Sequence, residues 1–580
     1  MTRPLGILMV SDVSPLVIEG GGERVLWEQA SRLAKRGHRV CIVSRRPGNG
    51  KTETVERQDV RIRYFPSDRR SILHFLFSSI GEARWAVDHT LAEEGSDVVQ
   101  LYQPLSGYGA LRSDRARGLP CLYTFLSPAP LEYISRRGMT GHHRPGLIGR
   151  MAQIMLWGIE RACLRHATRI HVLSDFSAMQ LWKLYRIPWD RIVKIPGGAD
   201  IERFQPTPDR DVLREAMGLP PGSPLLLTVR NLEARMGLDI LIRAMAILRQ
   251  RIPGVTLLIG GAGTLRRDLE SLTASLELQQ HVRFLGYIPE ADLPLYYQAA
   301  DAFVLPTREL EGFGLVTVEA LSCGTPVLGT AIGATPELLL PLDPSLMLRE
   351  TNPGAMADDL AHFFEARRSE PQPMVSLRQA CRRHVEHCYS WDASVQRLEE
   401  TLGALARRLS DPSVTRPCPA CDDLIRERDV TYLGQSYLRC AQCRTGVVVT
   451  LPSAALLRQQ YELEYPRCFC HEHVPEPRAD LFTSILDCMQ ALGLKGRLLD
   501  VGCGGGHFLG AAVQRGWRGL GTDLSHHACT VARRTGAQVA HADGAALPFR
   551  NEGVDAVSLI NVLDHTPNPL AILREAHRVL

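Results

Sequence analysis

Short apolar runs alternate with longer helical patterns in two separate stretches of this chain. In the first stretch, an apolar run over residues 7–11 precedes a glycine turn at 20–22, a helical pattern over 25–35 and a second apolar run over 40–44. The hydrophobic period changes from that of a strand to that of a helix and back, which predicts a βαβ unit. Glycines at the start of such a helix let a phosphate approach backbone N–H groups, although a simple turn is the alternative reading.

The second stretch repeats this alternation. Apolar runs at 225–229 and 255–259 are followed by helical patterns over 238–249 and 265–276. Two doubly wound α/β units in tandem are therefore predicted. Such units bind ligands outside the carboxyl ends of their parallel strands, so a ligand is expected in the cleft between them.

Length and charge limit the alternatives. A chain of 580 residues is too long for one hydrophobic core and predicts about three or four folding units. The net charge of +4 does not by itself indicate nucleic acid or an anionic membrane as a partner. No stretch resembles a signal peptide or a membrane span, and nine of the 15 cysteines lie after residue 417. This distribution predicts reduced thiols in a cytoplasmic protein with one local metal site.

Two carboxylates stand out in the second unit. An apolar run over 303–307 is followed by Glu311 in a loop and by Glu319 in a helix that is expected to start near Gly314. Eight residues at the helical rise separate the carboxylates by about 12 Å, comparable to two hydroxylated sugars joined by a diphosphate. Glu319 is expected to accept hydrogen bonds from a ribose diol, and Glu311 to face a transferred sugar. Solvated surface carboxylates are the alternative.

This spacing resembles the E-x7-E motif of the retaining GT-B glycosyltransferases of family 4. Further segments fall in family order over about residues 1–408, namely 20–24, 37–40, 195–200, 204–206 and 285–286. The resemblance implies two Rossmann-like domains, a nucleotide-diphosphate sugar donor bound mainly by the second, and an acceptor bound mainly by the first. It also implies a terminal helix, after Ser390 and Trp391, that crosses back to the first domain.

The resemblance assigns candidate site residues, with two departures from the family. Asn231 and Met236 occupy the usual basic positions, so Arg230 and Arg235 become the candidates that neutralise the diphosphate. Leu126 stands where many relatives have a histidine, which leaves acceptor activation without an evident base. The candidate catalytic residues are Glu311, Arg230 and Arg235, and the candidate donor-binding residues are Glu319, Gly312, Phe313, Gly314, Leu315, Gly21 and Gly22.

Retaining transfer tolerates the missing base if the leaving diphosphate itself accepts the acceptor's proton. The glycosyltransferase part is expected to work without a metal, because no Asp-x-Asp metal motif is apparent in it.

A polar, proline-bearing linker over 411–417 precedes a cysteine cluster. Cys418, Cys421, Cys440 and Cys443 follow the spacing C-x2-C-x18-C-x2-C, which is typical of a zinc ribbon. Four thiolates leave no open position for water, so the predicted zinc is structural. Incidental cysteines are the alternative.

The last part of the chain combines a strand over 497–501 with a glycine loop. His507 stands where a dinucleotide motif needs its third glycine, which argues against NAD. The ordered set over 497–565 resembles the class I S-adenosylmethionine-dependent methyltransferases. The resemblance implies cofactor contacts from Asp500, Gly502, Gly504, Asp523, Asp543 and Asn561.

The predicted fold class is α/β: a GT-B pair of Rossmann-like domains, a small zinc ribbon and a partial class I methyltransferase sheet. The expected parts are an acceptor-side domain (1–195), a donor-binding domain (196–380), a crossover helix (381–408), a linker (409–417), the ribbon (418–465) and the methyltransferase region (466–580). Only four strands of this last region, at 497–501, 519–522, 538–542 and 554–560, are found before the sequence stops, so a truncated, inactive methyltransferase with an uncovered edge strand is expected.

We therefore predict a glycosyltransferase fused to a methyltransferase of the same glycan or glycoconjugate pathway. The acceptor is expected to be a glycan, a lipid-linked or a small molecule, and nucleic acid is not expected. Residues 69–77 mix basic and apolar side chains, so peripheral contact with the inner face of the membrane is one reading and an ordinary buried helix is the other. A scaffold with inactive Rossmann units and a ribbon that binds protein or nucleic acid is the alternative function.

Overall fold

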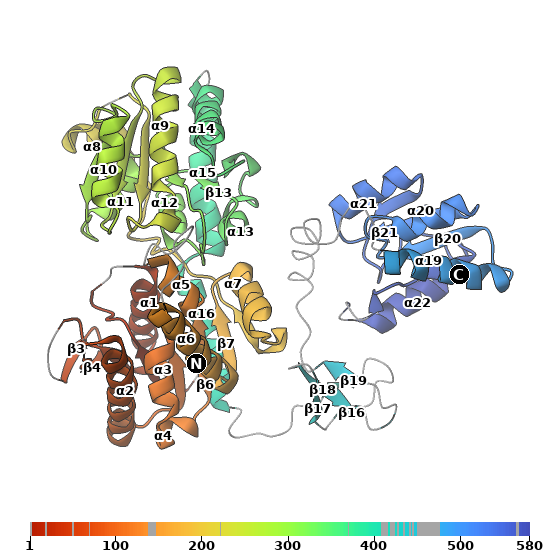
Figure 1. Cartoon of the computed structure of the whole chain (residues 1–580), viewed down its shortest axis with the longest axis horizontal. Helices are drawn as coiled ribbons and strands as arrows, with labels where there is room; N and C mark the ends of the chain where they lie inside the picture. Colours follow the sequence, from red (N-terminus) through yellow and green to blue (C-terminus); the bar gives the residue numbers. More distant parts are fainter. Residues whose placement is uncertain are drawn as a thin grey trace. The chain divides into compact units, whose positions relative to one another are not determined.

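The computed structural model consists of two compact units, 1–412 and 413–580. It describes residues 3–17, 20–48, 52–68, 70–136, 147–220, 222–368, 371–407, 416–417, 424–425, 428–432, 435–439, 442, 446–448, 476–563, 566 and 568–580. The first unit contains two separate sheets (Figure 1). We call the part built on the first sheet the N-terminal domain and the part built on the second the C-terminal domain.

The N-terminal domain has an eight-stranded sheet in the order β3-β4-β2-β1-β5-β6-β7-β8. All neighbouring strands run parallel except the pair β3–β4. The strands are β1 (Gly6–Ser11), β2 (Arg39–Arg45), β3 (Glu53–Arg57), β4 (Val60–Phe65), β5 (Val98–Leu101), β6 (Cys121–Phe125), β7 (Arg169–Val172) and β8 (Ile192–Lys194). The helices are α1 (Gly21–Lys35), α2 (Ile72–Glu94), α3 (Pro104–Leu111), α4 (Asp114–Arg117), α5 (Ala129–Arg136), α6 (Leu147–His166) and α7 (Asp175–Gln180).

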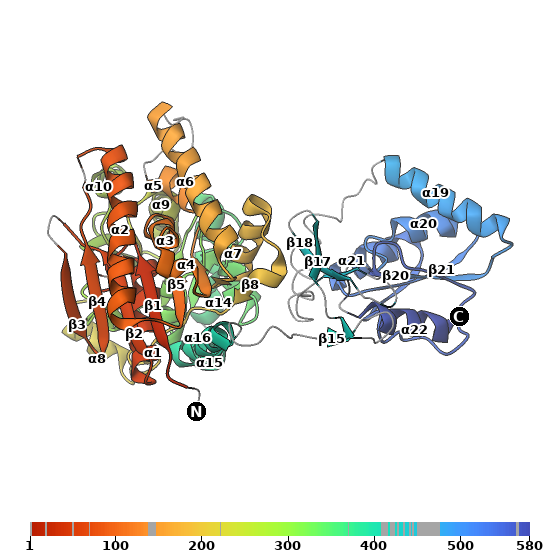
Figure 2. The ribbon, with the colours of Figure 1, turned by 90° about the horizontal axis from the view of Figure 1, so that it is seen from below.

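Alternate side chains of β1 enter different cores, as the period of a strand buried on both faces requires. Ile7 and Met9 pack in the same core as Val25 of α1, whereas Leu8 and Val10 pack with α2, α3 and α6. Figure 2 shows the strands β3, β4, β2 and β1 side by side in that order, and the helix α2 packs against β2 and β4. The predicted βαβ unit is thus confirmed as part of a doubly wound sheet.

The C-terminal domain has a six-stranded, fully parallel sheet in the order β11-β10-β9-β12-β13-β14. Its strands are β9 (Leu225–Val229), β10 (Thr256–Gly260), β11 (Val282–Gly286), β12 (Ala302–Leu305), β13 (Val327–Thr330) and β14 (Met347–Leu348). Its helices are α8 (Arg210–Ala216), α9 (Leu238–Arg251), α10 (Arg266–Ser275), α11 (Leu293–Ala299), α12 (Leu315–Ser322), α13 (Thr335–Leu339), α14 (Pro353–Arg368) and α15 (Pro371–Cys388).

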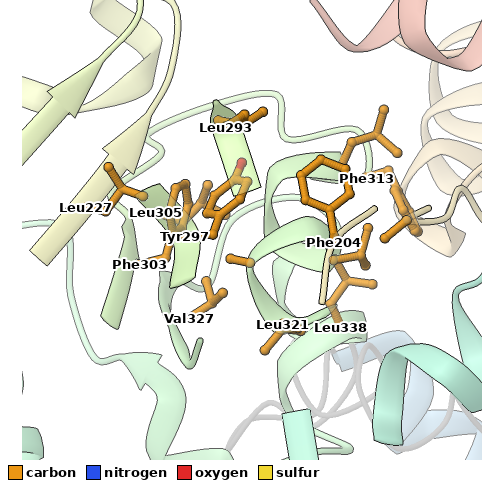
Figure 3. Close-up of a cluster of buried hydrophobic side chains, with 14 of the residues drawn as sticks. Phe204, Leu227, Leu293, Tyr297, Phe303, Leu305, Phe313, Leu321, Val327 and Leu338 are labelled. Atoms are coloured by element: carbon orange, nitrogen blue, oxygen red, sulfur yellow. The ribbon is translucent and has the colours of Figure 1, made fainter. Parts of the chain in front are cut away.

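Aromatic side chains fill the core beneath α12. Tyr297 of α11 lies between Phe204 and Phe303, with ring centroids 5.9 Å and 5.6 Å apart (Figure 3). Its ring is buried while its hydroxyl donates to Glu319, so this core holds one carboxylate of the predicted site. A tyrosine can serve this double role because its body is apolar and its tip is polar.

The last helix of the first unit, α16 (Trp391–Arg407), lies against the N-terminal domain. Glu399 pairs with Arg36 at the end of α1 and with His38, and the views show α16 among the elements of the first sheet (Figures 1 and 2). Trp391 is almost fully buried at the start of this helix. The chain therefore passes from the C-terminal domain back to the N-terminal one.

The second unit contains a four-stranded parallel sheet in the order β22-β21-β20-β23. The strands are β20 (Arg497–Val501), β21 (Arg518–Asp523), β22 (Gln538–His541) and β23 (Ala556–Ser558), and the helices are α19 (Glu476–Ala491), α20 (His507–Gln514), α21 (His526–Ala532) and α22 (Pro569–Val579). Leu498 packs with α19 and α20, whereas Leu499 packs with α22, so helices cover both faces. The edge strand β23 buries Ala556.

Short antiparallel strands precede this sheet. They are β15 (Arg416–Pro417) paired with β16 (Leu424–Ile425), and β17 (Arg428–Tyr432), β18 (Gln435–Arg439) and β19 (Gly446–Val448) in a three-stranded sheet. Among the described residues, no helix is both long and apolar enough to cross a bilayer.

Candidate active site

The centre of the candidate site is a buried ion pair between Glu311 and Arg230. Arg230 directly follows β9 and Glu311 lies in the loop before α12, so two neighbouring strands bring them together. The Oε2 atom of Glu311 accepts from Nη2 of Arg230 at 2.7 Å and from Oγ1 of Thr307 at 3.0 Å. The other terminal nitrogen of Arg230, Nη1, is buried without a hydrogen-bond partner. A buried donor of this kind is costly unless a ligand accepts its hydrogen bond.

A glycine lies against the backbone carbonyl of each of these two residues. Gly333 has a φ of +63°, and a Cβ there would lie 2.0 Å from the carbonyl oxygen of Glu311. Gly261 has a φ of +119°, and its Cβ would lie 1.9 Å from the carbonyl oxygen of Arg230. Only glycine tolerates both the dihedral angle and the close approach.

Arg235 lies next to this pair, on a 3-10 turn over Ala234–Met236. Its Nη1 donates to the carbonyl oxygen of Leu310 at 3.3 Å, and its Nε lies 3.4 Å from a carboxylate oxygen of Glu233. The structure thus brings Arg230 and Arg235 together at the Glu311 loop. Their contact with a diphosphate stays a prediction.

The loop from Gly312 to Leu315 lies between the two domains. The carbonyl oxygen of Gly312 accepts from Ser174 at 2.5 Å and from Ser177 at 3.3 Å, and both serines belong to the N-terminal domain. A Cβ at Gly312 would lie 2.6 Å from the carbonyl oxygen of Leu126. The predicted donor-binding loop is therefore fixed by the N-terminal domain as well as by its own domain.

The neighbouring residues of this loop complete the contact. The ring of Phe313 packs over Gly197 and contacts Tyr389, with ring centroids 5.9 Å apart. Gly314 has a φ of +86° and is the N-cap of α12. Leu315 lies against Gly21, where a Cβ would be 3.6 Å from its side chain. The N-termini of α1 and α12 therefore approach each other.

A Cβ at Gly22 would lie 3.4 Å from the Leu126 side chain. Gly21 thus faces α12, whereas Gly22 faces Leu126, whose carbonyl oxygen lies beside Gly312. Helix N-termini carry partial positive charge and free N–H groups, so the point where the N-termini of α1 and α12 approach each other suits an anion.

Glu319 is only 1% exposed, and both of its oxygens have protein partners. Oε1 pairs with Nη1 of Arg24 at 3.0 Å, and Oε2 accepts from the Tyr297 hydroxyl at 3.1 Å. Burial raises the pKa of Glu319, and the charge of Arg24 opposes that shift. The alternative of a solvated surface carboxylate is thereby excluded for Glu319, and also for Glu311, which is 8% exposed.

The N-terminal domain contains a buried titratable group, Glu160, that sequence reasoning missed. Glu160 of α6 is almost fully buried, accepts from the backbone N–H of Ala129 at 3.2 Å, and also bonds the Tyr185 hydroxyl. Burial raises the pKa of Glu160 to about 8. Leu126, two residues before Pro128, is partly buried and packs its apolar side chain against the core. No pattern of spacing in the sequence distinguishes Glu160 from other helical carboxylates.

In the second unit, two carboxylates lie at the carboxyl ends of neighbouring strands. Asp500 accepts from the Ser558 hydroxyl at 2.7 Å, and burial raises its pKa to about 7. Asp523 accepts from the backbone N–H groups of Gly504 at 2.9 Å and Ser525 at 2.8 Å. Asp523 therefore fixes the glycine loop that the sequence predicted beside it.

The glycine loop needs its glycines. Gly502 and Gly504 have φ values of +70° and +54°, and a Cβ at Gly502 would lie 2.7 Å from Val562. Asp543 follows β22 and accepts from the N–H of Ala545 at 2.9 Å, while Asn561 follows β23 with a φ of +55°. All six predicted cofactor residues thus follow, or lie at the carboxyl ends of, the strands of one sheet, where α/β folds bind ligands.

The predicted zinc ligands Cys418, Cys421, Cys440 and Cys443 lie outside the described residues. Within the described part of the chain, no cluster of three potential ligands is found. Strand β15 ends directly before Cys418, and β18 ends directly before Cys440.

The fold of the first unit is that of the GT-B glycosyltransferases. It aligns with sucrose-phosphate synthase from Thermosynechococcus elongatus at a TM-score of 0.58 and 23% identity, over 69% of this chain and 99% of that one. The structure of Anabaena Alr3699/HepE in complex with UDP-glucose aligns at a TM-score of 0.54 and 21% identity, over 69% and 100%. The predicted α/β fold with a GT-B pair of Rossmann-like domains is confirmed, and the zinc ribbon stays a prediction.

Sequence comparison identifies the family. Residues 19–203 match glycosyltransferase family 4, residues 209–382 match the glycosyl transferases group 1, and residues 499–580 match a methyltransferase domain. The D-inositol 3-phosphate glycosyltransferase of Saccharomonospora viridis is 30% identical over 428 residues, which cover 69% of this chain and 95% of that one. The chain belongs to the group 1 glycosyltransferases and carries a methyltransferase domain.

Sequence reasoning missed three partners in the site: Arg24, Thr307 and Tyr297. Arg24 belongs to a segment that the sequence marked only by family order, and Tyr297 reads as one more apolar position of a helix. Both contact Glu319, which lies 295 positions after Arg24 and 22 positions after Tyr297 in the chain. The only signal in the sequence for the role of Tyr297 is that its side chain carries a hydroxyl at a position where the helical pattern predicts burial.

Proposed function

We propose that the first unit is a retaining glycosyltransferase that moves a sugar from a nucleotide-diphosphate sugar to a hydroxyl group of an acceptor. The observation that carries this proposal is the buried Arg230–Glu311 pair, with one arginine donor unsatisfied, beside the N-terminus of α12. Cationic donors and a helix N-terminus suit a leaving diphosphate, and a fixed carboxylate beside them suits a sugar hydroxyl.

The proposed roles follow from position. Arg230 and Arg235, with the backbone N–H groups at the start of α12 and at Gly21 and Gly22, bind the diphosphate. Glu311 contacts the transferred sugar, and Glu319 accepts from the ribose diol. A carboxylate offers about four acceptor positions, and Arg24 and Tyr297 account for two, so the capacity that remains matches a diol.

The transfer needs no enzyme nucleophile in this scheme. The acceptor oxygen bonds to the anomeric carbon on the face from which the diphosphate leaves, as the bond from that carbon to the diphosphate oxygen breaks. The acceptor's proton passes to the departing diphosphate oxygen, which Arg230 and the helix N-terminus stabilise as its charge develops. We propose that this half works without a metal.

The acceptor is proposed to be a glycan, a lipid-linked or a small molecule. The name of the Saccharomonospora viridis relative favours phosphorylated polyols as the first acceptors to test. Phe77 of α2 is 72% exposed while its neighbour Leu76 is buried, so this helix presents one large apolar side chain at the surface. Peripheral membrane contact and a cytoplasmic location stay predictions.

A donor panel tests the proposal. UDP-, GDP- and ADP-sugars are incubated with the full chain and candidate acceptors, and released nucleoside diphosphate is measured. We expect release from at least one donor, and Glu319→Gln should weaken binding of the corresponding nucleotide 10- to 100-fold because a charged hydrogen bond is lost. Absence of turnover and of nucleotide binding across the panel would favour the scaffold alternative.

We propose that the second unit binds S-adenosylmethionine and acts in the same glycan or glycoconjugate pathway. The glycine loop holds Gly502 and Gly504 at positive φ, and Asp500, Asp523, Asp543 and Asn561 lie at or after the ends of strands of the same sheet. When bound, this cofactor supplies an electrophilic methyl group. The described residues would orient it through the glycine loop and the carboxylates.

We also propose one structural zinc in the cysteine-rich segment. The donor set of four thiolates in two C-x2-C pairs suits tetrahedral zinc, and each pair begins directly after a strand, β15 or β18. Metal analysis of the purified chain should give one zinc per chain, and the double variant Cys418→Ser, Cys421→Ser should lose it. Sugar transfer should persist in that variant, because the ribbon folds as a separate metal-dependent part. Zinc-free wild-type protein would contradict this assignment.

A further inference from the structure

The second carboxylate of the site depends on an arginine from the other domain. Arg24 is in the first turn of α1, directly after the glycine turn, and its side chain is only 10% exposed. One terminal nitrogen pairs with Glu319 at 3.0 Å, and the other bonds Glu290, which follows β11. The guanidinium thus connects the N-terminal domain to two carboxylates of the C-terminal domain.

Glu290 is itself held in place. Its other oxygen accepts from Nη2 of Arg203 at 2.9 Å, and Arg203 stacks over Phe204 with 4.7 Å between the guanidinium carbon and the ring centroid. The resulting series of alternating charges is Glu319, Arg24, Glu290 and Arg203. A fork-shaped guanidinium suits this bridge because it presents donors in fixed directions, which an ammonium group does not.

The other groups that face Glu319 cannot replace Arg24. Tyr297 donates one hydrogen bond but carries no charge, Glu290 adds negative charge, and Cys323 on the same helix is buried with a thiol whose pKa is raised by burial. Arg203 is paired with Glu290. Burying an ionised carboxylate without a charged partner is costly, so Glu319 without Arg24 would tend to take up a proton.

We propose that Arg24 is a positioning residue that keeps the Glu319 carboxylate ionised and oriented for the ribose of the donor, and so couples donor binding to the contact between the two domains. This inference rests on the proposed role of Glu319. It assigns a function to a residue that touches neither the transferred sugar nor the diphosphate in the scheme above.

Helix α1 offers a matched control. Arg36, at the end of the same helix, makes another cross-contact: its Nη1 pairs with Glu399 of α16 at 3.0 Å, far along the helix from Glu319. Arg36→Gln therefore removes an ion pair between α1 and α16 without touching the series that ends at Glu319. An effect caused merely by loosening α1 should appear in both variants.

The experiment measures nucleotide binding to the full chain by calorimetry, with UDP, GDP and ADP as probes and the tightest of them retained. At pH 7, Arg24→Gln should raise the Kd at least about 10-fold, as expected for loss of a charged contact. Arg24→Lys should recover part of the affinity, and Arg36→Gln should leave the Kd unchanged. In the Glu319→Gln background, Arg24→Gln should have no further effect.

The pH profile separates positioning from a structural role. Arg24 opposes the burial that raises the pKa of Glu319, so its removal shifts that pKa further up. The ionised form is then lost as pH falls through the higher pKa. The Kd ratio of Arg24→Gln to wild type should therefore grow from pH 9 to pH 6, and titration of the nucleotide cancels in that ratio.

Each outcome has one meaning. If Glu319→Gln weakens binding but Arg24→Gln does not, or if Arg24→Gln binds more tightly, the inference is overturned and the proposed function stands. If Glu319→Gln itself leaves the Kd unchanged, the ribose role of Glu319 fails, and the inference fails with it. A pH-independent ratio, or an equal loss in Arg36→Gln, would reduce Arg24 to a structural contact.

Discussion

Replacing Glu311 by glutamine should lower kcat about 100-fold or more and change the Kd for nucleotide only a few-fold. The glutamine keeps the shape of the side chain but loses the charge that pairs with Arg230 at 2.7 Å. In our proposal the contact between Glu311 and the transferred sugar strengthens as charge develops at that sugar, so its loss affects the transition state more than the ground state. Steady-state kinetics and nucleotide titration of the variant measure the two effects separately.

Glu309 provides the control for this variant because it lies in the same loop and is exposed. Glu309→Gln removes one charge from the loop and should leave kcat close to the wild-type value. A kcat of Glu311→Gln within threefold of wild type would contradict the proposed role of Glu311. Equal losses in both variants would indicate an effect of loop charge and not of the buried pair.

Replacing Gly333 by alanine should destabilise the first unit by about 2–4 kcal/mol and lower kcat/KM as well. The new Cβ would lie 2.0 Å from the carbonyl oxygen of Glu311, so the backbone that carries Glu311 must move. The positive φ of +63° adds strain of its own. Urea unfolding and steady-state kinetics of the same preparation test both effects.

Gly218 provides a control that separates the steric overlap with Glu311 from the backbone strain of a positive φ. Its φ of +62° is almost the same as that of Gly333, but nothing lies within 4 Å of the position of its Cβ. Gly218→Ala should therefore cost only about 1 kcal/mol, with kcat/KM unchanged. If the two alanine variants lose equal stability, the contact between Gly333 and Glu311 contributes nothing beyond the dihedral angle.

The sheets of this protein could be predicted because their strands are buried on both faces. The run over residues 225–229 reads as a continuous apolar segment and is strand β9 with the same bounds. The helix expected to start near Gly314 begins at Leu315, because a glycine with a φ of +86° caps it. Where the local pattern was weaker, bounds shifted: the strand expected over 554–560 is only Ala556–Ser558.

The partners within the site could not be predicted in the same way. Arg230 and Glu311 are 81 positions apart, and Arg24 and Glu319 belong to different domains. Hydrophobic period identifies which face of an element is buried, but an ion pair depends on how whole elements pack. The family motif predicts that Glu311 and Glu319 lie near a ligand, but it gives no indication that both carboxylates are buried and already paired.

The stereochemistry of transfer tests the central claim most directly. A donor with an α-linked sugar is incubated with the full chain and an accepted hydroxyl acceptor, and the anomeric proton of the product is observed by NMR. A retaining enzyme that uses the leaving diphosphate as the proton acceptor must give the α-glycoside, and Glu311→Gln should give the same anomer more slowly. A β-glycoside would show attack from the opposite face and would contradict the account.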